Sequence, residues 1–412
     1  MALTAIVDIR DVDAPEGPAT PVAGLSLIHR TARLAIVAGA DQVLILRGAD
    51  EPSPVDLGLG ECHRGVPIID GHLASDEAPA CLETTTLLYL RADAVYHRSS
   101  IQSTASRISD LIEPGQTLAN EDRRIRIHHL ASPTDDPRRC LQRIAESPSP
   151  TDDQLNPQWH LPITDAEAVQ EASNRLWKAC RKPEDGIVAQ LLNRHISIAI
   201  SKRLVSTNIG PNHVTALTFL LGVAAAVAAA GGGYLGFLLA GLIYQANSVI
   251  DGVDGELARV RYEFSFLGEW LDTISDDLAD LFFYIGLGIG AWHTVPPPSF
   301  LPDTTWLLLG LSAAAGKLLS MAVYYRWLIA NERGDLLAFQ WSFEEPSNEA
   351  GSPLQRLLSS TRYLFRKDFI VFAAMLCAIA GALPYLLFAL APGNLIVAAS
   401  VLIQQLKGAP RP

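Results

Sequence analysis

Residues 214–250 read VTALTFLLGVAAAVAAAGGGYLGFLLAGLIYQANSVI and contain no Asp, Glu, Lys or Arg. A helix crosses the hydrocarbon core of a bilayer with about 20 apolar residues, so this run is long enough for two crossings. Gly231-Gly232-Gly233 predicts a tight turn between them. Residues 369–406 form a second uncharged run of similar length. The sequence therefore excludes a purely soluble enzyme and a disordered chain.

The composition of the whole chain narrows the class further. Of its 412 residues, 49% are hydrophobic and 18% are charged, and 32 Lys+Arg oppose 44 Asp+Glu. Because no dense basic patch occurs, we expect no nucleic acid among its partners. The five cysteines are scattered without a CxxC pair, which predicts neither a zinc site nor a disulfide framework. The N-terminus has no basic region followed by a long apolar run, so no signal peptide is expected.

Residues 1–130 predict a soluble α/β domain. Residues 25–38 have apolar positions at helical spacing and end at Gly39, a typical helix C-terminal signal. The strand candidates are residues 4–9, 42–46, 85–90 and 124–130. Strand, helix and strand in this order predict a parallel sheet.

Residues 165–412 predict a polytopic membrane domain, and residues 131–164, rich in Pro, Ser and Asp, predict a linker before it. Helices are expected at 165–181 and 185–206. The second is basic and amphipathic, which is typical of a helix lying in the membrane interface, or else of an ordinary surface helix. Six spans are expected at 214–231, 234–259, 264–292, 304–328, 369–383 and from a turn at 391–394 to about 406.

The positive charges of this region lie on one side of the predicted topology. The connections 231–234, 293–303 and 391–394 contain no Lys or Arg. The opposite side carries Lys202, Arg203, Arg259, Arg261, Arg326, Arg333, Arg356, Arg362, Arg366, Lys367, Lys407 and Arg411. Positive charge favours the cytoplasmic side, so we expect a multi-pass protein of the cell membrane with both termini cytoplasmic. Tyr324-Tyr325 and Trp327 are interpreted as interfacial aromatics rather than as part of a site.

Directly after the first uncharged run, residues 251–276 read DGVDGELARVRYEFSFLGEWLDTISD. Asp251 and Asp254 share one helical face, and so do Asp272 and Asp276 on the next helix. A short connection brings the four carboxylates together at a membrane boundary, where ionised groups need a counter-charge. Oxygen ligands suit Mg²⁺, Mn²⁺ or Ca²⁺, and two such ions suit substitution at phosphorus. The alternative is a solvated acidic loop.

Three neighbours of these aspartates fit the same chemistry. Gly255 and Gly268 remove side chains where a nucleotide or another helix must approach. Arg259 can contact a diphosphate or pair with an aspartate. Asp277 points about 100° away from Asp276 on a helix, so it is not expected among the metal ligands.

The pattern D-x2-D-G-x2-A-R-x8-G-x3-D-x3-D resembles the signature of the CDP-alcohol phosphotransferases, also called phosphatidyltransferases. All eight fixed positions are present: Asp251, Asp254, Gly255, Ala258, Arg259, Gly268, Asp272 and Asp276. The resemblance covers about residues 183–406. It implies transfer of a phosphoryl-linked group from a CDP-alcohol to an acceptor hydroxyl, with release of CMP. It also implies a homodimer, contact with membrane lipid and two Mg²⁺ or Mn²⁺ ions on the first three aspartates, with Asp276 as base or further ligand.

Residues 207–215 resemble the Pro-Asn entry of this family to its first span. The resemblance implies that Pro211, Asn212 and Thr215 lie near the nucleotide. The alternative is an ordinary helix start with proline in the first turn.

A second group of basic residues is a candidate for binding an acceptor phosphate. Lys317 is a charge in the middle of a span, where it either binds that phosphate or pairs with a carboxylate such as Asp280. Arg362, Arg366 and Lys367 cluster at the cytoplasmic end of the fifth span. In the family, basic residues in this area bind the acceptor phosphate, while the alternative is the positive-inside bias.

The N-terminal domain resembles a nucleotidyltransferase in residues 22–30, 38–46 and 87–93, and the fusion resembles the archaeal bifunctional inositol-phosphate enzymes. Residues 8–18 read DIRDVDAPEGP, an acidic stretch in place of the Gly-rich basic loop that holds a triphosphate. No Lys occurs through Asp165. We therefore expect an inactive domain with a regulatory, scaffolding or dimer role.

The substrates stay open at this point. A CDP-diacylglycerol donor with a polar acceptor fits a lipid enzyme, and the domain fusion favours CDP-inositol with inositol phosphate. Two other classes also use aspartates in membranes. A prenyltransferase carries its aspartate motifs on separated helix pairs, and a transporter would show a matching second half, which is not evident here.

Overall fold

The computed structural model describes residues 3–48, 50–60, 62–63, 65–72, 86–98, 101, 117–119, 124–129, 159–182, 185–331 and 366–406. The chain divides into two compact units. The first is Met1–Ala179 with Val260–Tyr262, and the second is Cys180–Arg259 with Glu263–Pro412. Each unit is described by itself.

A seven-stranded sheet forms the centre of the first unit, in the order β5-β6-β4-β1-β7-β10-β9. Its strands are β1 (Leu3–Asp8), β4 (Gln42–Arg47), β5 (Cys62–His63), β6 (Val66–His72), β7 (Thr86–Arg91), β9 (Thr117–Ala119) and β10 (Ile125–His129). β1 pairs in parallel with β4 and β7, as the strand–helix–strand order predicts. β10 runs antiparallel to β7, so the sheet is mixed.

The centre of the sheet is buried. Every residue of β1 is buried, which is typical of a central strand covered on both faces. Helix α1 (Leu27–Val37) packs on the sheet through residues such as Leu34. It begins two residues later than the pattern predicts, because β2 (Pro21–Val22) pairs with β3 (Leu25–Ser26). The unit also contains η1 (Gly17–Ala19), β8 (Ala94–Tyr96), β11 (His160–Pro162) and α5 (Ala166–Ala179).

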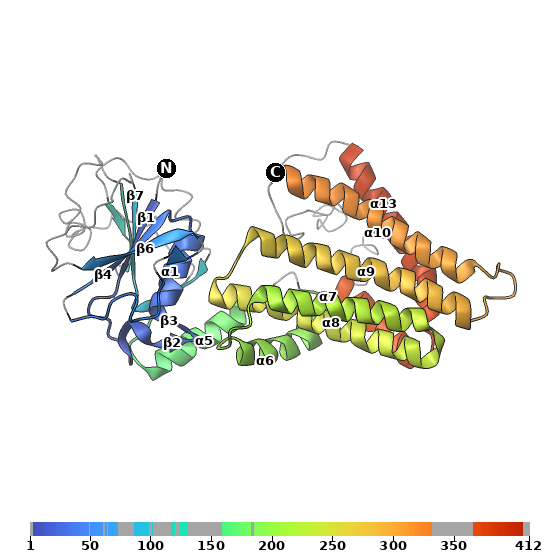
Figure 1. The fold of residues 1–412 in the computed structure, drawn as a ribbon, viewed down its shortest axis with the longest axis horizontal. Helices are drawn as coiled ribbons and strands as arrows, with labels where there is room; N and C mark the ends of the chain where they lie inside the picture. The colour runs from blue at the N-terminus through green and yellow to red at the C-terminus, as the bar shows by residue number, and fades with distance from the viewer. Residues whose placement is uncertain are drawn as a thin grey trace, which may run out of the picture. The chain divides into compact units, whose positions relative to one another are not determined.

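The described part of the second unit is helical. Its elements are η2 (Ala189–Asn193, a π-helical turn), α6 (Arg194–Leu204), α7 (Pro211–Gly231), α8 (Gly233–Arg261), α9 (Phe266–Thr294), α10 (Thr305–Ala330), α12 (Lys367–Ile379), η5 (Leu383–Leu386) and α13 (Leu387–Leu406). Figure 1 shows α7 and α10 beside α9, and α13 beside α10. Their apolar core includes Phe283, Leu287 and Trp306.

Small residues let these helices approach closely. A Cβ on Gly222 of α7 would lie 2.4 Å from the Ala279 Cβ of α9. A Cβ on Gly288 of α9 would lie 2.9 Å from the Gly310 Cα of α10. Helix pairs in membranes commonly use this kind of contact, and here it fixes α9 between its two neighbours.

Four of the described helices are long and apolar enough to cross a membrane: Pro211–Gly231, Gly233–Arg261, Thr305–Ala330 and Leu383–Ile403. Helices also occupy the other two predicted spans. Of these, α9 carries Glu269, Asp272, Asp276, Asp277 and Asp280 in its first half, and α12 has only 13 residues. The helical architecture is therefore as predicted, and four of the six predicted spans are long and apolar enough to cross a membrane.

The predicted turn at residues 391–394 is wrong. Helix α12 ends before Gly381, whose φ of +71° is a left-handed conformation that glycine adopts without strain. The Ala382 N–H closes this end by donating to the Cys377 carbonyl at 2.7 Å. Helix α13 then runs through Pro392, and transmembrane helices tolerate proline better than soluble ones.

Candidate metal and phosphate site

Three carboxylates from the two motif helices converge in the second unit. Asp251 and Asp254 lie on α8 and Asp272 lies on α9, and one ligand atom from each lies within 4.8 Å of the others. Thr215 donates its hydroxyl to Asp254 Oδ2 at 2.8 Å. Asp251 Oδ1 is buried and has no hydrogen-bond partner in the described part of the chain. A cluster of carboxylate oxygens with one buried oxygen unpaired fits a divalent cation that prefers oxygen ligands.

The start of α9 explains how Asp272 reaches the cluster. Ser265 caps this helix by accepting a hydrogen bond from the Gly268 N–H at 2.9 Å. A Cβ on Gly268 would lie 3.1 Å from Asn212 Oδ1, so the missing side chain lets the beginning of α7 lie against the beginning of α9. The close approach expected at Gly268 is thus between helices.

The predicted nucleotide residues surround the same carboxylates. Pro211 is the first residue of α7, and Thr215, one turn later, contacts Asp254. Arg259 lies one turn after Gly255, where a Cβ would lie 3.0 Å from its Nη1. Arg259 Nε and Nη2 are buried and without a hydrogen-bond partner among the described residues. They are donors available to an anion. Ala258 accepts a backbone hydrogen bond from Glu263.

Asp276 belongs to a chain of ion pairs beside the cluster. Its Oδ2 lies 2.8 Å from Lys367 Nζ, which also lies 3.6 Å from Asp280. Lys317 Nζ lies 3.0 Å from Asp280 and 2.7 Å from Asp277. The predicted pairing of Lys317 with Asp280 is therefore present, and Asp280 lies between the two lysines. The cluster of three carboxylates includes neither Asp276 nor Asp277.

Tyrosines complete this chain in a way that the sequence reasoning missed. Tyr244 donates to Asp280 at 2.6 Å, and the hydroxyls of Tyr324 and Tyr325 both donate to Asp277. The interpretation of Tyr324-Tyr325 as interfacial aromatics alone is wrong, because Tyr324 is 2% exposed. The available signal was the presence of Asp277 and Asp280 within an apolar helix, since buried carboxylates need donors from neighbouring helices.

Of the predicted basic cluster, Lys367 reaches the site through its ion pair with Asp276. It is the first residue of α12, and Arg366 is the N-cap of that helix. Arg362 lies outside the described residues.

The carboxylates at the strand ends of the first unit are held by arginines. Asp8, at the end of β1, accepts hydrogen bonds from Arg10 at 2.8 and 2.9 Å and from Tyr89. Burial raises the pKa of Asp8, but these hydrogen bonds outweigh it and hold the pKa below its usual value. Asp93 pairs with Arg91 at 2.8 Å and with Arg124 at 3.0 Å. Both carboxylates are thus engaged by cations of the chain itself.

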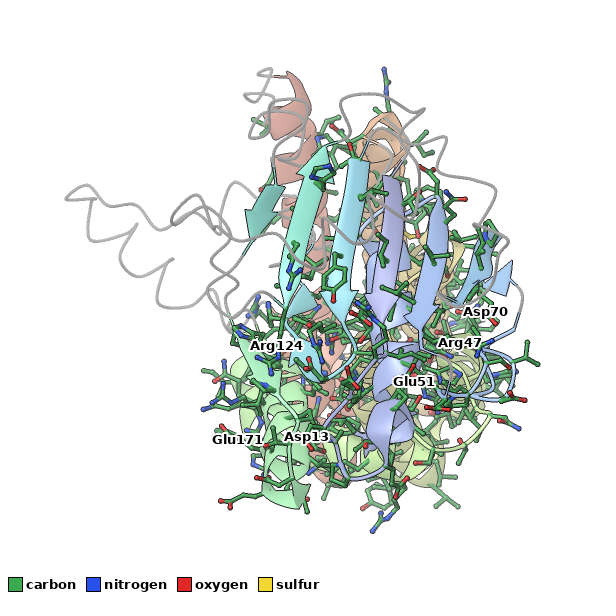
Figure 2. All side chains as sticks on the ribbon, turned by 90° about the vertical axis from the view of Figure 1, so that its left-hand side faces the viewer. Asp13, Arg47, Glu51, Asp70, Arg124 and Glu171 are labelled. Atoms are coloured by element: carbon green, nitrogen blue, oxygen red, sulfur yellow. The ribbon has the colours of Figure 1, made fainter. Side chains whose placement is uncertain are left out.

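Figure 2 shows the side chains around this sheet, with Arg124 labelled just before β10. At the edge where Asp70 is labelled, Arg47 pairs with Asp70 at 2.7 Å and donates to the Glu51 carbonyl at 3.1 Å. Exposed pairs of this kind contribute little to stability.

The converging aspartates lie within a region that has known relatives. Residues 208–341 match the CDP-alcohol phosphatidyltransferase family. The match contains all eight fixed positions of the signature, so the family resemblance of this region is confirmed. The CDP-alcohol phosphatidyltransferase match covers α7, α8, α9 and α10. Of these helices, α8 and α9 carry the three clustered carboxylates.

Curated relatives share part of the chain. A protein named "Bifunctional IPC transferase and DIPP synthase" from Aquifex aeolicus is 36% identical over 152 residues, which are 37% of this chain and 33% of the relative. The protein of the same name from Thermococcus kodakarensis is 35% identical over 154 residues, 37% of this chain and 32% of the relative. The matches therefore span about a third of the length of these relatives.

Two further similarities are more limited. An "Archaetidylinositol phosphate synthase" from Pyrococcus horikoshii is 35% identical over 92 residues, 22% of this chain and 47% of the relative. The crystal structure of HddC from Yersinia pseudotuberculosis covers 42% of this chain and 98% of its own, with 9% identity and a TM-score of 0.26. A TM-score at this level supports no conclusion about the fold.

Proposed function

We propose that the chain is an integral membrane CDP-alcohol phosphotransferase, which transfers a substituted phosphoryl group from a CDP-alcohol to an acceptor hydroxyl and releases CMP. The observation that carries this proposal is the convergence of Asp251, Asp254 and Asp272 within 4.8 Å, inside the region that matches the CDP-alcohol phosphatidyltransferase family. The chemistry needs a site that binds a diphosphate and offsets its charge, and carboxylates that hold divalent cations provide one.

The three clustered aspartates would hold two Mg²⁺ or Mn²⁺ ions, with Asp276 as a further ligand if it is not the base. When bound, these ions neutralise the carboxylates and polarise the phosphorus–oxygen bonds of the donor. Arg259 contributes the unpaired donors of its guanidinium to the diphosphate. Pro211, Asn212 and Thr215 position the nucleotide at the start of α7, where Thr215 also orients Asp254.

The reaction forms one bond and breaks one. The acceptor oxygen attacks the β-phosphorus, which bears the alcohol, and the bond from that phosphorus to the bridging oxygen of CMP breaks. Asp276 takes the proton of the acceptor hydroxyl on a carboxylate oxygen. Its ion pair with Lys367 at 2.8 Å fixes that carboxylate in place before the step.

For the acceptor we propose a polyol phosphate. Two lysines from different helices, Lys317 and Lys367, lie along one row of carboxylates beside Asp276, and a phosphate could compete for them. The name of one relative, the archaetidylinositol phosphate synthase, supports an inositol-phosphate class of substrate. The donor is then CDP-inositol or a CDP-lipid. A prenyltransferase or a transporter is supported by none of these observations.

The surrounding architecture follows from the same proposal. We propose six spans with both termini cytoplasmic, in which α9 and α12 cross together with the four helices that are apolar enough by themselves. For the domains we propose an inactive nucleotidyltransferase-like domain at residues 1–130, a linker at 131–164 and a membrane domain at 165–412. Within these bounds, β11 and α5 belong to the first compact unit, and the second unit begins at Cys180. Two copies form a homodimer.

The test is a substrate panel on the purified full-length protein. CDP-inositol and CDP-diacylglycerol are each combined with inositol phosphate, with inositol and with no acceptor, in the presence of Mg²⁺ or Mn²⁺. We expect CMP and a phosphodiester product, identified by mass spectrometry, only when inositol phosphate is present. EDTA should stop the reaction. Product formed equally well with unphosphorylated inositol would contradict the proposed acceptor.

A further inference from the structure

The segment before the first span turns its polar side inward. We define the interfacial segment as Asp185–Leu204, which comprises η2 and α6. Several of its large apolar side chains are exposed, including Leu191 at 74% and Ile187 at 49%, whereas Val188 is buried. Its inward side chains are polar, with Ser197 at 1% and Ser201 at 0% exposure. Buried polar side chains therefore contribute to the contact that holds this segment to the unit.

The partner of these polar side chains is Glu256, a carboxylate of α8 that is 0% exposed. Ser197 and Ser201 each donate a hydroxyl to it at 2.6 Å, and Arg194 Nη1 donates at 3.1 Å. A buried carboxylate is costly unless donors surround it, and here three donors come from one helix. Glu256 can be satisfied in this way only when α6 and α8 keep one relative position.

Arg194 is itself fixed on its other side. Its Nη2 and Nε donate to the Asp185 carboxylate at 2.8 and 2.9 Å. A Cβ on Gly252 would lie 2.8 Å from Arg194 Nη1, so the glycine leaves room for the guanidinium against α8. Such bidentate pairs have a specific geometry and fix orientation as well as supplying energy.

The interfacial segment also contacts the helix that bears Lys367. The Ala189 N–H donates to Asp368 Oδ2 at 3.0 Å, and Asp368 is the residue after Lys367. Lys367 in turn reaches Asp276 at 2.8 Å. The segment is thus attached to α8 and to α12, and both helices present a side chain to the proposed site.

Glu256 lies behind the metal carboxylates. At 100° per residue it is about 200° around α8 from Asp254 and about 140° from Asp251. With side chains reaching about 5.5 Å from the helix axis, a rotation of about 10° moves a side-chain oxygen by about 1 Å. A displacement of about 1 Å in a catalytic group can lower a rate by about 100-fold. An anchor on the far side of α8 therefore controls the geometry of the cluster.

We propose that Glu256 is a positioning residue, which fixes the rotation of α8 against the interfacial segment and so holds Asp251 and Asp254 in line with Asp272. Glu256 touches no substrate in this role. The inference rests on the proposed function only in taking the three aspartates as the metal site, and it is tested by metal binding without any substrate.

The first experiment measures Mn²⁺ binding to the full-length protein by the electron paramagnetic resonance signal of free Mn²⁺. Glu256→Gln is compared with the wild type and with Glu171→Gln, which makes the same change in an exposed ion pair of α5. We expect Glu256→Gln to weaken Mn²⁺ binding by about tenfold, the lower end of what supporting residues of metal sites contribute. Glu171→Gln should bind as the wild type does.

A folded Glu256→Gln protein with wild-type Mn²⁺ affinity would overturn the proposal. If that variant does not fold, Ser201→Ala replaces it, because it removes one donor and leaves the carboxylate, and it should weaken Mn²⁺ binding by a smaller factor. A wild type that binds Mn²⁺ but releases no CMP from any donor would refute the proposed function alone, since the comparison of affinities would still decide the role of Glu256.

A second measurement separates positioning through the interfacial segment from a general loss of stability. Arg194→Gln and Glu256→Gln are combined, and Mn²⁺ affinity is measured for each single variant and for the pair. Residues that act through one contact are not additive, so we expect the double variant to bind about as weakly as the weaker single one. Losses that multiply would show that the two residues act separately, and would contradict the proposal.

Discussion

Replacing Asp251 by Asn should stabilise the metal-free protein while removing its response to metal. The three clustered carboxylates have ligand atoms within 4.8 Å of one another. At an effective dielectric constant of about 20, each ionised pair at that distance repels by about 3.5 kcal/mol, so Asp251 contributes about 7 kcal/mol of repulsion. The repulsion that Asp251 contributes cannot exceed the free energy needed to protonate one carboxyl. For a carboxyl with the ordinary pKa near 3.9, that free energy is about 4 kcal/mol at pH 7.

The expected gain for Asp251→Asn in EDTA is therefore between about 1 and 4 kcal/mol. The substitution is nearly isosteric, and Asp251 Oδ1 has no hydrogen bond to lose within the described residues. For a unit of this size, that gain corresponds to a rise of about 2 to 16 °C in the melting temperature. With Mn²⁺ added, the wild type should gain stability in proportion to binding, and the variant should gain much less.

The assay is thermal unfolding of purified protein in detergent, with EDTA and then with a series of Mn²⁺ concentrations. The matched control is Asp303→Asn, a change in the connection before α10, which should leave both melting temperatures unchanged. A variant that melts below the wild type in EDTA would refute the reasoning about repulsion. Equal protection of variant and wild type by Mn²⁺ would refute the assignment of Asp251 as a metal ligand.

The remaining predictions concern Asp276, Lys317 and the first unit. Asp276→Asn should lower kcat by at least tenfold with little change in the KM of the donor, because a base acts in the chemical step; equal losses in turnover and donor affinity would make Asp276 a ligand instead. Lys317→Met should destabilise the protein by about 3 kcal/mol, because Asp277 and Asp280 lose a buried cation, and an unchanged melting temperature would show that the ion pairs contribute nothing. The third prediction uses the full-length protein carrying Asp251→Asn, incubated with CTP, Mg²⁺ and polyol phosphates. It should release no pyrophosphate, because Asp8 and Asp93 are paired with arginines. Release at an enzymatic rate would refute the proposed inactivity of residues 1–130.

Local spacing was enough to predict the central features of the site. Asp251 and Asp254 are three residues apart on one helix, and only a short connection separates them from the helix of Asp272, so their convergence follows from helical geometry. The same holds for the parallel strands β1 and β4, whose apolar runs flank a helix of suitable length. These features depend on residues close together in the sequence.

Features that depend on contacts between distant segments could not be predicted. The role of Glu256 depends on Ser197 and Ser201, which precede it by more than 50 residues. Strand β6 was not predicted because Pro67 interrupts its pattern, although the strand pairs with β4 at the side of the sheet. The turn before α13 was placed at Pro392 because proline is a strong signal, whereas the left-handed Gly381 ends the preceding helix.

The most direct measurement is the rate of CMP release by purified full-length protein supplied with CDP-inositol, inositol phosphate and Mn²⁺. Wild type and Asp272→Asn are compared at the same amount of folded protein. We expect steady CMP release by the wild type that depends on the acceptor and on Mn²⁺. We expect a loss of at least about 100-fold in Asp272→Asn, comparable to the loss of one electrostatic catalytic group. CMP release by Asp272→Asn at the wild-type rate would contradict a transfer reaction carried out by the clustered aspartates.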